Sequence, residues 1–250
     1  MLLREKTIVV TGASSGIGAA AAKMFSAQGA KLVLGARRED RLKQIADEIV
    51  QIGGRVEILA GDVGRDAYAS CLVDLAEDRF GGLDAAFNNA GIIGEMGPIA
   101  EMSEDNWQSV IQTNLTSGFH AAKHQIPALK RRGGGSIVFT STFVGHTVGL
   151  PGMAAYAASK AGLIGMTQVL AVEHGIDKIR VNALLPGGTK TEMAGDDPGA
   201  HEWISGLHAL KRMAEPEEIA KAAMFLLSDQ SAFVTGSAMI VDGGNSINKT

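Results

Sequence analysis

Two side chains that could transfer a proton stand one helical turn apart in the stretch AAYAASKAG, residues 154–162. Tyr156 and Lys160 are four positions apart, and side chains at this spacing are neighbours on one face of a helix. A free tyrosine has a pKa of about 10, too high for a base at neutral pH, but a nearby positive charge lowers it by favouring the phenolate. The pair is therefore a candidate acid/base device. On this stretch alone, a packed tyrosine beside a solvated lysine is the alternative.

A glycine-rich turn lies near the start of the chain, in TIVVTGASSGIG, residues 7–18. It joins a predicted strand directly to a predicted helix, as in dinucleotide-binding proteins. Gly12 permits the tight turn, Gly16 lets the backbone approach a pyrophosphate, and Gly18 lets the helix pack closely on the sheet. The helix N-terminus then offers free N–H groups and the positive end of its dipole to phosphate. This segment predicts dinucleotide binding.

The elements that must position these residues alternate along the whole chain, with short β-rich runs between longer helical patterns. Such alternation predicts right-handed parallel crossovers and helices on both faces of a sheet. No linker, low-complexity tract or repeat interrupts the series, so we expect an α/β fold: a single doubly wound Rossmann-type domain over residues 1–250 with a seven-stranded parallel sheet. Strands are expected at about 7–11, 31–35, 56–60, 84–87, 136–140, 179–185 and 237–241, and helices at about 16–28, 38–52, 66–80, 104–131, 154–175 and 217–228.

Composition narrows the class of protein further. The net charge of −4, with scattered Lys and Arg, predicts no nucleic-acid partner and no anionic-membrane surface. The single cysteine, Cys71, excludes an intramolecular disulfide and a thiolate metal cluster, and we expect its thiol to be buried. His120 and His124 have metal-ligand spacing but no acidic third ligand beside them, so no metal site is expected. Without a signal-peptide pattern or an apolar run of about 18 residues, a cytoplasmic location is expected.

The T-G-x-x-x-G-x-G form of the turn, together with Tyr156-x-x-x-Lys160, resembles the short-chain dehydrogenase/reductase family. The resemblance spans nearly the whole chain, because further family motifs follow in the family's order. These are Asp62-Val63 after the third predicted strand, Asn88-Asn89-Ala90-Gly91 after the fourth, Asn114 within QTNLTS, and Pro186-Gly187 with Thr189 and Thr191 after the sixth.

The resemblance implies hydride transfer between a nicotinamide cofactor and a small-molecule carbonyl or alcohol, with Tyr156 as acid/base. In the family the lysine also holds the ribose hydroxyls, and the asparagine links it to solvent through a water, which are the parts implied for Lys160 and Asn114. Family members are usually tetramers, so a homotetramer pairing the helices near 104–131 and 154–175 and the C-terminal strand is expected. The implied cofactor-binding residues are Gly12, Ser14, Ser15, Gly16, Ile17, Gly18, Arg37, Asp62, Val63, Asn89, Ala90, Gly91, Tyr156, Lys160, Pro186, Gly187, Thr189 and Thr191.

Cofactor choice depends on the sequence LGARRED at the end of the second predicted strand. NAD enzymes place an acid there for the ribose 2′-hydroxyl, whereas a nearby arginine accommodates a 2′-phosphate. Ala36 stands where the acid would be, and Arg37 resembles the family's phosphate-binding arginine. NADP(H) is therefore the favoured cofactor, with NAD(H) as the alternative.

The sequence departs from the family at one position. Members usually carry a catalytic serine 13 residues before the tyrosine, where this chain has Phe143. The neighbouring hydroxyls are Ser141 and Thr142. A glycine typically follows the serine by three residues, and Gly145 therefore favours Thr142, whose hydroxyl has the same donor and acceptor capacity as serine. Ser141, adjacent on a strand, should point to the opposite face.

The substrate is not readable from the sequence. Residues 191–210 are polar, contain Gly and Pro and follow the implied nicotinamide loop, so a lid over the substrate is expected there. Two rivals to a general carbonyl/alcohol oxidoreductase remain: a 3-oxoacyl-thioester reductase of fatty-acid-type metabolism, and a non-catalytic dinucleotide-sensing regulator.

Overall fold

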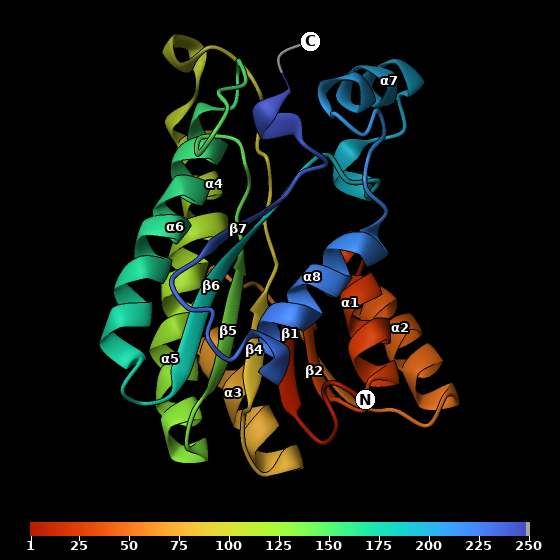
Figure 1. Cartoon of the computed structure of the whole chain (residues 1–250), viewed down its shortest axis with the longest axis vertical. Helices are drawn as coiled ribbons and strands as arrows, with labels where there is room; N and C mark the ends of the chain where they lie inside the picture. Colours follow the sequence, from red (N-terminus) through yellow and green to blue (C-terminus); the bar gives the residue numbers. More distant parts are fainter. Residues whose placement is uncertain (249–250) are drawn as a thin grey trace.

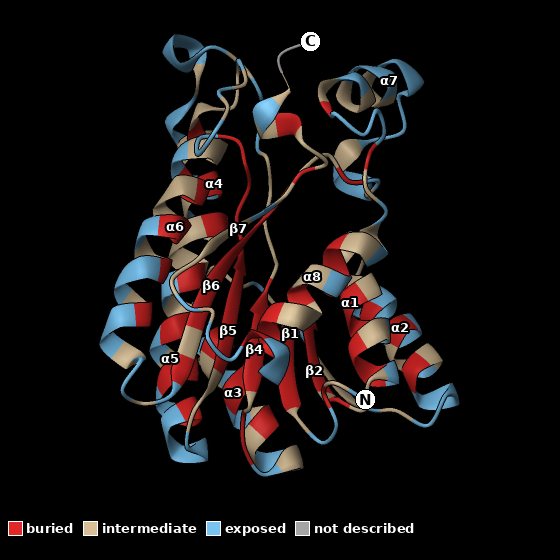
Figure 2. Ribbon diagram, viewed as in Figure 1, coloured by how far each residue is buried: buried red, intermediate tan, exposed pale blue. Residues whose placement is uncertain are grey.

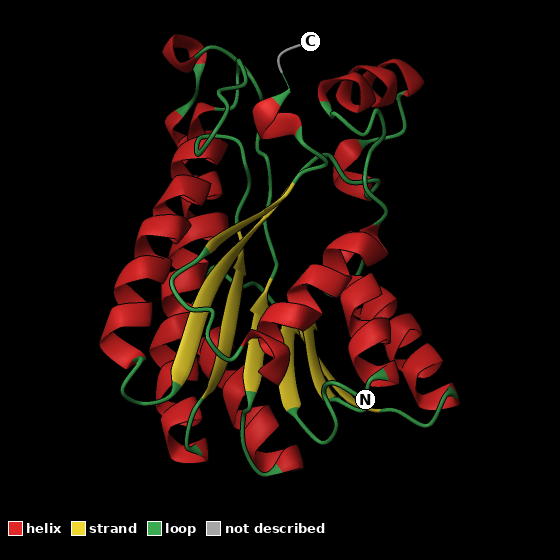
Figure 3. Ribbon diagram, in the orientation of Figure 1, coloured by secondary structure: helices red, strands yellow, loops and turns green. Residues whose placement is uncertain are grey.

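A seven-stranded, all-parallel sheet forms the centre of the molecule, in the order β3-β2-β1-β4-β5-β6-β7 (Figures 1 and 3). The computed structural model describes residues 1–248. The doubly wound α/β fold predicted from the alternating pattern is confirmed. The strands are β1 Thr7–Thr11, β2 Lys31–Ala36, β3 Arg55–Ala60, β4 Ala85–Asn88, β5 Gly135–Thr140, β6 Ile179–Pro186 and β7 Ala238–Val241.

Helices cover both faces of this sheet, which explains why its central strands are continuously apolar rather than alternating (Figure 2). One apolar cluster joins α1, α2 and α8 to one face, through residues such as Phe25, Leu42 and Ile219. A second joins α3, α5 and α6 to the other face. The helices are α1 Gly16–Ala27, α2 Glu39–Gln51, α3 Asp66–Phe80, α4 Glu104–Ile111, α5 Ser117–Arg132, α6 Ala154–His174, α7 Pro198–Leu207 and α8 Pro216–Leu227. No helix in the described part of the chain is both long enough and apolar enough to cross a membrane.

The helix expected over residues 104–131 is present, because the chain is continuously helical from Glu104 to Arg132, but its middle is not a regular α-helix. A π-helical turn, Gln112–Thr116, separates α4 from α5. Such turns widen the backbone and occur frequently at functional sites. Here the turn carries Asn114, whose side chain bonds to the backbone of Ile92 in another loop.

Residues 191–210 contain more helix than expected. After a short 3₁₀ helix, Glu192–Ala194, α7 begins at Pro198, and the Asp197 carboxylate caps it by accepting from Gly199 N at 3.2 Å and Ala200 N at 3.1 Å. Figure 1 places α7 beyond the carboxyl ends of the strands.

The sheet has its topological switch point between β1 and β4, where ligands of open α/β sheets bind outside the carboxyl ends. Thr11 at the end of β1 ties the two strands together there, because its hydroxyl accepts from Asn89 N at 3.1 Å and Ala90 N at 3.2 Å. The glycine-rich turn and the N-N-A-G motif therefore meet at one place.

Candidate active site

The glycine-rich turn has a shape that only glycine allows. Gly12 has φ +67°, and a Cβ on it would lie 2.9 Å from Ala90 Cα. A Cβ on Gly18 would lie 2.2 Å from the Gly12 carbonyl oxygen, which confirms that the helix packs closely on the turn. Ser15 is the N-cap residue of α1, but its hydroxyl accepts no hydrogen bond from the helix backbone. The first N–H groups of α1 are therefore available to another acceptor. The donors and the close backbone approach fit the pyrophosphate of a dinucleotide.

Beside this turn lies an open groove of about 540 Å³ between α1, α2 and residues 190–196. Arg38 bridges its two sides. Its guanidinium donates to Ser14 Oγ at 3.1 Å and Ser15 Oγ at 2.7 Å, and to Glu192 Oε2 at 2.7 Å. Arg37, the arginine singled out from the sequence, is exposed and bonds to none of the described residues. The arginine that contacts the glycine-rich turn is therefore Arg38 rather than Arg37, and the sequence LGARRED did not distinguish the two.

The Asp62-Val63 pair lies at the rim of the site. Asp62 is exposed, and its carboxylate accepts from Gly64 N at 2.9 Å, which shapes the turn after β3. Val63 is half-buried. An adenine contact by this pair stays a prediction.

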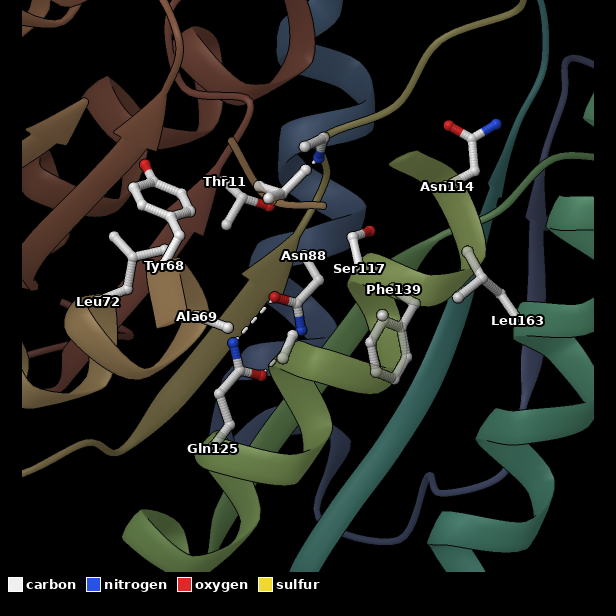
Figure 4. Close-up of a pocket in the computed structure, with 14 residues that line it drawn as sticks. Thr11, Tyr68, Ala69, Leu72, Asn88, Asn114, Ser117, Gln125, Phe139 and Leu163 are labelled. Carbon is white, nitrogen blue, oxygen red and sulfur yellow. Dashed lines mark hydrogen bonds between the residues drawn. The ribbon is translucent and has the colours of Figure 1, made fainter. Parts of the chain in front are cut away.

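The first asparagine of the N-N-A-G motif has a structural partner that the sequence did not indicate. Asn88 and Gln125 exchange two hydrogen bonds, each of 2.9 Å, across a small cavity (Figure 4). That cavity of about 20 Å³ has room for little more than one water and is too small for a substrate. Asn89 faces the turn instead, and its Oδ1 accepts from Thr140 Oγ1 at 3.1 Å.

Tyr156 and Lys160 are brought together with the hydroxyls at the end of β5. Lys160 Nζ lies 5.9 Å from the centroid of the Tyr156 ring and donates to the Thr140 carbonyl at 2.6 Å. Thr142 is buried, and its side chain acts on the Tyr156 phenol by opposing the rise in the phenol's pKa. Ser141 is buried, and its hydroxyl donates to the Lys160 carbonyl at 2.7 Å. The Ser141 hydroxyl is thus engaged by the backbone, and Thr142 as the substitute for the family's serine stays a prediction.

Burial dominates the ionisation of this pair. It raises the pKa of Tyr156 to about 12, and the hydrogen bond with Thr142 opposes it. Burial also lowers the pKa of Lys160 to about 8, because the low-dielectric surroundings disfavour the ammonium. The expectation that Lys160 lowers the pKa of Tyr156 is therefore not met by the chain's own groups, since burial has the larger effect. Tyr156 is held as a neutral phenol, which is a proton donor.

Asn114 is buried and fixed by three hydrogen bonds. Its Nδ2 donates to the Ile92 carbonyl at 2.8 Å and Ser159 Oγ at 3.0 Å, and its Oδ1 accepts from Ile92 N at 2.8 Å. A Cβ on Gly91 would lie 3.1 Å from Lys160 Nζ and 3.2 Å from Asn114 Oδ1, so the N-N-A-G motif runs close to both side chains. The structure thus places Asn114 beside Lys160 across Gly91.

The loop after β6 is held by a histidine that sequence reasoning missed. Gly188 N donates to His208 Nε2 at 3.0 Å, so Nδ1 carries the ring proton and donates to the Ile204 carbonyl of α7 at 2.7 Å. His208 is 2% exposed. A neutral imidazole therefore fastens the loop containing Pro186, Gly187 and Thr189 to α7.

Thr191 lies against the phosphate-binding turn at the other end of that loop. A Cβ on Gly16 would lie 2.9 Å from Thr191 Cγ2. Ile17, next to Gly16, is half-buried in the first turn of α1. The cofactor-binding roles implied for both residues stay predictions.

Neither Cys71 nor His124 belongs to the candidate site. Cys71 is exposed, so the expectation of a buried thiol was wrong; it lies on the outer side of α3. His124 Nε2 lies 3.0 Å from Asp66 Oδ1, and the same carboxylate forms an ion pair with Lys123. Residues 1–248 contain no group of three His, Cys, Asp or Glu side chains that could hold a metal ion.

Known proteins similar to this chain share its full length. A family model described as enoyl-(acyl carrier protein) reductase matches residues 12–246. The A-factor type gamma-butyrolactone 1′-reductase (1S-forming) of Streptomyces virginiae is 41% identical over 98% of this chain and 97% of its own. The 3-oxoacyl-[acyl-carrier-protein] reductase of Chlamydia muridarum is 39% identical over 97% and 98%. A short-chain type dehydrogenase/reductase from Mycobacterium marinum superposes with a TM-score of 0.94, at 33% identity over 98% and 97% of the chains.

The sheet order, the glycine-rich turn at the switch point and the Tyr156–Lys160 pair at the end of β5 agree with these full-length similarities. The chain is an oxidoreductase that belongs to the short-chain dehydrogenase/reductase family.

Proposed function

We propose that the protein is an NADP(H)-dependent oxidoreductase that interconverts a ketone or aldehyde with an alcohol. The observation that carries the proposal is the grouping of Thr142, Tyr156 and Lys160 at the carboxyl end of β5, beside the N-N-A-G motif. The names of the relatives, a gamma-butyrolactone 1′-reductase and a 3-oxoacyl reductase, support reduction of a carbonyl.

Each side chain has a defined task in this proposal. Nicotinamide supplies or accepts the hydride when bound. The Thr142 hydroxyl holds the substrate oxygen beside Tyr156, and the neutral phenol donates its proton to the developing alkoxide. Lys160 holds the ribose hydroxyls, and Asn114 positions a water that links Lys160 to solvent. Residues 191–210 form a lid over the substrate.

The preference for NADP(H) is supported by the absence of an acid at Ala36 and by the two arginines that follow it. Arg38 lies on the phosphate-binding turn and Arg37 is exposed next to it, so either can meet a 2′-phosphate. Ala36→Asp with Arg37→Ala is expected to shift binding from NADPH toward NADH, measured by fluorescence titration of both cofactors. Tighter binding of NADH than NADPH by the parent protein would contradict the assignment.

A 3-oxoacyl-thioester reductase is the second candidate, favoured by the name of the Chlamydia muridarum relative. The 191–210 segment weighs against it, because this segment carries four acidic residues and no Lys or Arg, whereas acyl thioesters of phosphopantetheine carry negative charge. A non-catalytic dinucleotide sensor has no need of the grouped Thr142, Tyr156 and Lys160. Oxidation of NADPH across a panel of cyclic ketones, acyclic ketones, aldehydes and 3-oxoacyl thioesters separates the three. Turnover of the simple carbonyls supports the proposal, activity confined to thioesters supports the second candidate, and no turnover supports the sensor.

We further propose that the protein is a cytoplasmic homotetramer. The family's usual assembly suggests the tetramer, and a row of apolar side chains on α6 is exposed in the single chain, including Val169 and Val172.

A further inference from the structure

One carboxylate reaches into the region where the cofactor's phosphates are proposed to lie. Glu192 belongs to the 191–210 segment, yet its Oε2 lies 2.7 Å from Nη1 of Arg38. The same guanidinium donates to Ser14 and Ser15 of the phosphate-binding turn. The pair therefore fastens the proposed lid to the turn.

All three nitrogens of the Arg38 guanidinium donate hydrogen bonds in this arrangement. Its Nε and Nη2 are directed at the two serine hydroxyls, and its Nη1 at the carboxylate of Glu192. Arg38 also holds the pKa of Glu192 below its ordinary value, with a smaller contribution from a hydrogen bond to Ser15. An arginine fork and serine hydroxyls are the groups that bind a phosphate monoester, so the carboxylate uses donors that suit a phosphate.

We propose that Glu192 is a cofactor-selectivity residue, whose carboxylate competes with the cofactor's 2′-phosphate for Arg38 and ties the 191–210 segment to the phosphate-binding turn. This inference rests on the proposed NADP(H) dependence. A cofactor that ends in a 2′-hydroxyl has no need to displace Glu192. A cofactor with a 2′-phosphate must take the guanidinium from it and thereby frees the segment.

The expected change in cofactor affinity depends on how far the Arg38 and Glu192 side chains are exposed to water. The Arg38 side chain is 48% exposed and that of Glu192 54%, so water screens their attraction. Exposed ion pairs of this kind contribute modestly, which corresponds to about a two- to fivefold change in an equilibrium constant. Glu192 is therefore expected to tune selectivity rather than determine it alone.

The test is a binding titration of NADPH and NADH to the parent, Glu192→Gln and Glu202→Gln. Glu202 is the matched control, because it is an exposed acid on α7 of the same segment and pairs with no described residue. Glu192→Gln is expected to tighten NADPH binding by about two- to fivefold and to leave NADH binding unchanged, since only the 2′-phosphate competes for Arg38. Glu202→Gln is expected to change neither. An unchanged ratio of NADPH to NADH affinity in Glu192→Gln, or an equal gain in Glu202→Gln, overturns the proposal.

A second measurement needs no cofactor and therefore separates this inference from the proposed function. Hydrogen exchange of the backbone amides in 192–207 is compared between the parent and the two variants without ligand. Faster exchange in Glu192→Gln alone is expected, because the contact that ties the segment to the turn is weakened. Equal exchange in all three proteins overturns the tie. A parent that binds NADH more tightly than NADPH would instead contradict the proposed cofactor.

Discussion

At the scale of single residues, the proposed proton transfer from Tyr156 depends on which hydroxyl holds the substrate oxygen beside it. The side chain of Thr142 acts on the phenol, whereas the Ser141 hydroxyl donates to the Lys160 carbonyl. Adjacent residues of an extended chain point to opposite faces, and this alternation favours Thr142 over Ser141 although Phe143 stands at the family's usual serine position. The catalytic part of Thr142 stays a prediction.

Substitution of these two hydroxyls separates their roles. Thr142→Val keeps the shape and removes the hydrogen bond to the substrate oxygen, so turnover should fall by at least about tenfold. Ser141→Ala should leave turnover largely intact and lower the free energy of unfolding by about 1 kcal/mol, because one buried hydrogen bond is lost. Steady-state kinetics and urea unfolding of both variants check this. The reverse pattern would assign the catalytic hydroxyl to Ser141.

Lys160 should make stability depend on pH in a defined direction. Burial lowers its pKa from 10.5 to about 8, so between these values the unfolded chain binds a proton that the folded chain has released. The free energy of unfolding therefore gains from Lys160 as pH rises from about 8 to 10.5, and this gain is absent below about 8, where both states are protonated. Lys160→Met has no ammonium at this position, so its free energy of unfolding should lack this dependence on pH.

The comparison is the difference in unfolding free energy between the parent and Lys160→Met. It should shift in favour of the parent by up to about 3 kcal/mol from below pH 8 to above pH 10. Tyr156 titrates in both proteins, so its contribution largely cancels. A difference that stays flat with pH would mean that the ammonium is solvated.

At the scale of elements, the sequence indicated the strands and most helices well, because buried parallel strands are short continuous apolar runs. It did not indicate the π-helical turn at Gln112–Thr116, since one wider turn barely changes the helical periodicity. The bonds from Asn114 to Ile92 cross 22 positions of sequence. The contact between Arg38 and Glu192 spans 154 positions. Contacts of this range depend on how elements pack, and no local pattern reports them.

The attachment of α7 can be tested through His208. His208→Ala leaves the half-buried Gly188 N–H without its acceptor, which costs about 1 kcal/mol. We expect faster hydrogen exchange across α7 and a larger rise in KM than fall in kcat, because the proposed lid loosens while Tyr156 and Lys160 keep their places. His201→Ala is the control, since the His201 ring is hydrogen-bonded to the Gly195 carbonyl within the same segment and not to the loop after β6. Equal effects of the two variants would argue against a specific fastening by His208.

At the scale of the whole molecule, the family could be predicted from motifs in the right order, and the full-length similarities confirm it. The substrate could not, because the acidic character of the 191–210 segment weighs against one substrate class and identifies no other. The proposed homotetramer rests on exposed apolar side chains instead. Val169, Val172 and Ile176 form a row along α6 and the residues after it, and they are 55%, 85% and 91% exposed.

Burial of this row between copies predicts that Val172→Glu breaks the proposed homotetramer. A charge placed in an apolar interface is left without a partner, so the assembly should dissociate to smaller species in light scattering coupled to size-exclusion chromatography. Val50→Glu is the control, because Val50 is also exposed, at 59%, but lies on α2. The same mass for Val172→Glu and the parent would contradict pairing through α6.

The central claim is that Tyr156 is the acid/base of a carbonyl–alcohol oxidoreductase. The most direct test is single-turnover oxidation of NADPH by Tyr156→Phe with the carbonyl that the parent reduces fastest, alongside a titration of NADPH binding. The variant lacks only the phenolic proton, so we predict unchanged folding, NADPH affinity close to the parent's and a rate lower by about 100- to 10,000-fold. A rate within a few-fold of the parent would contradict the account, because proton transfer would then depend on another group.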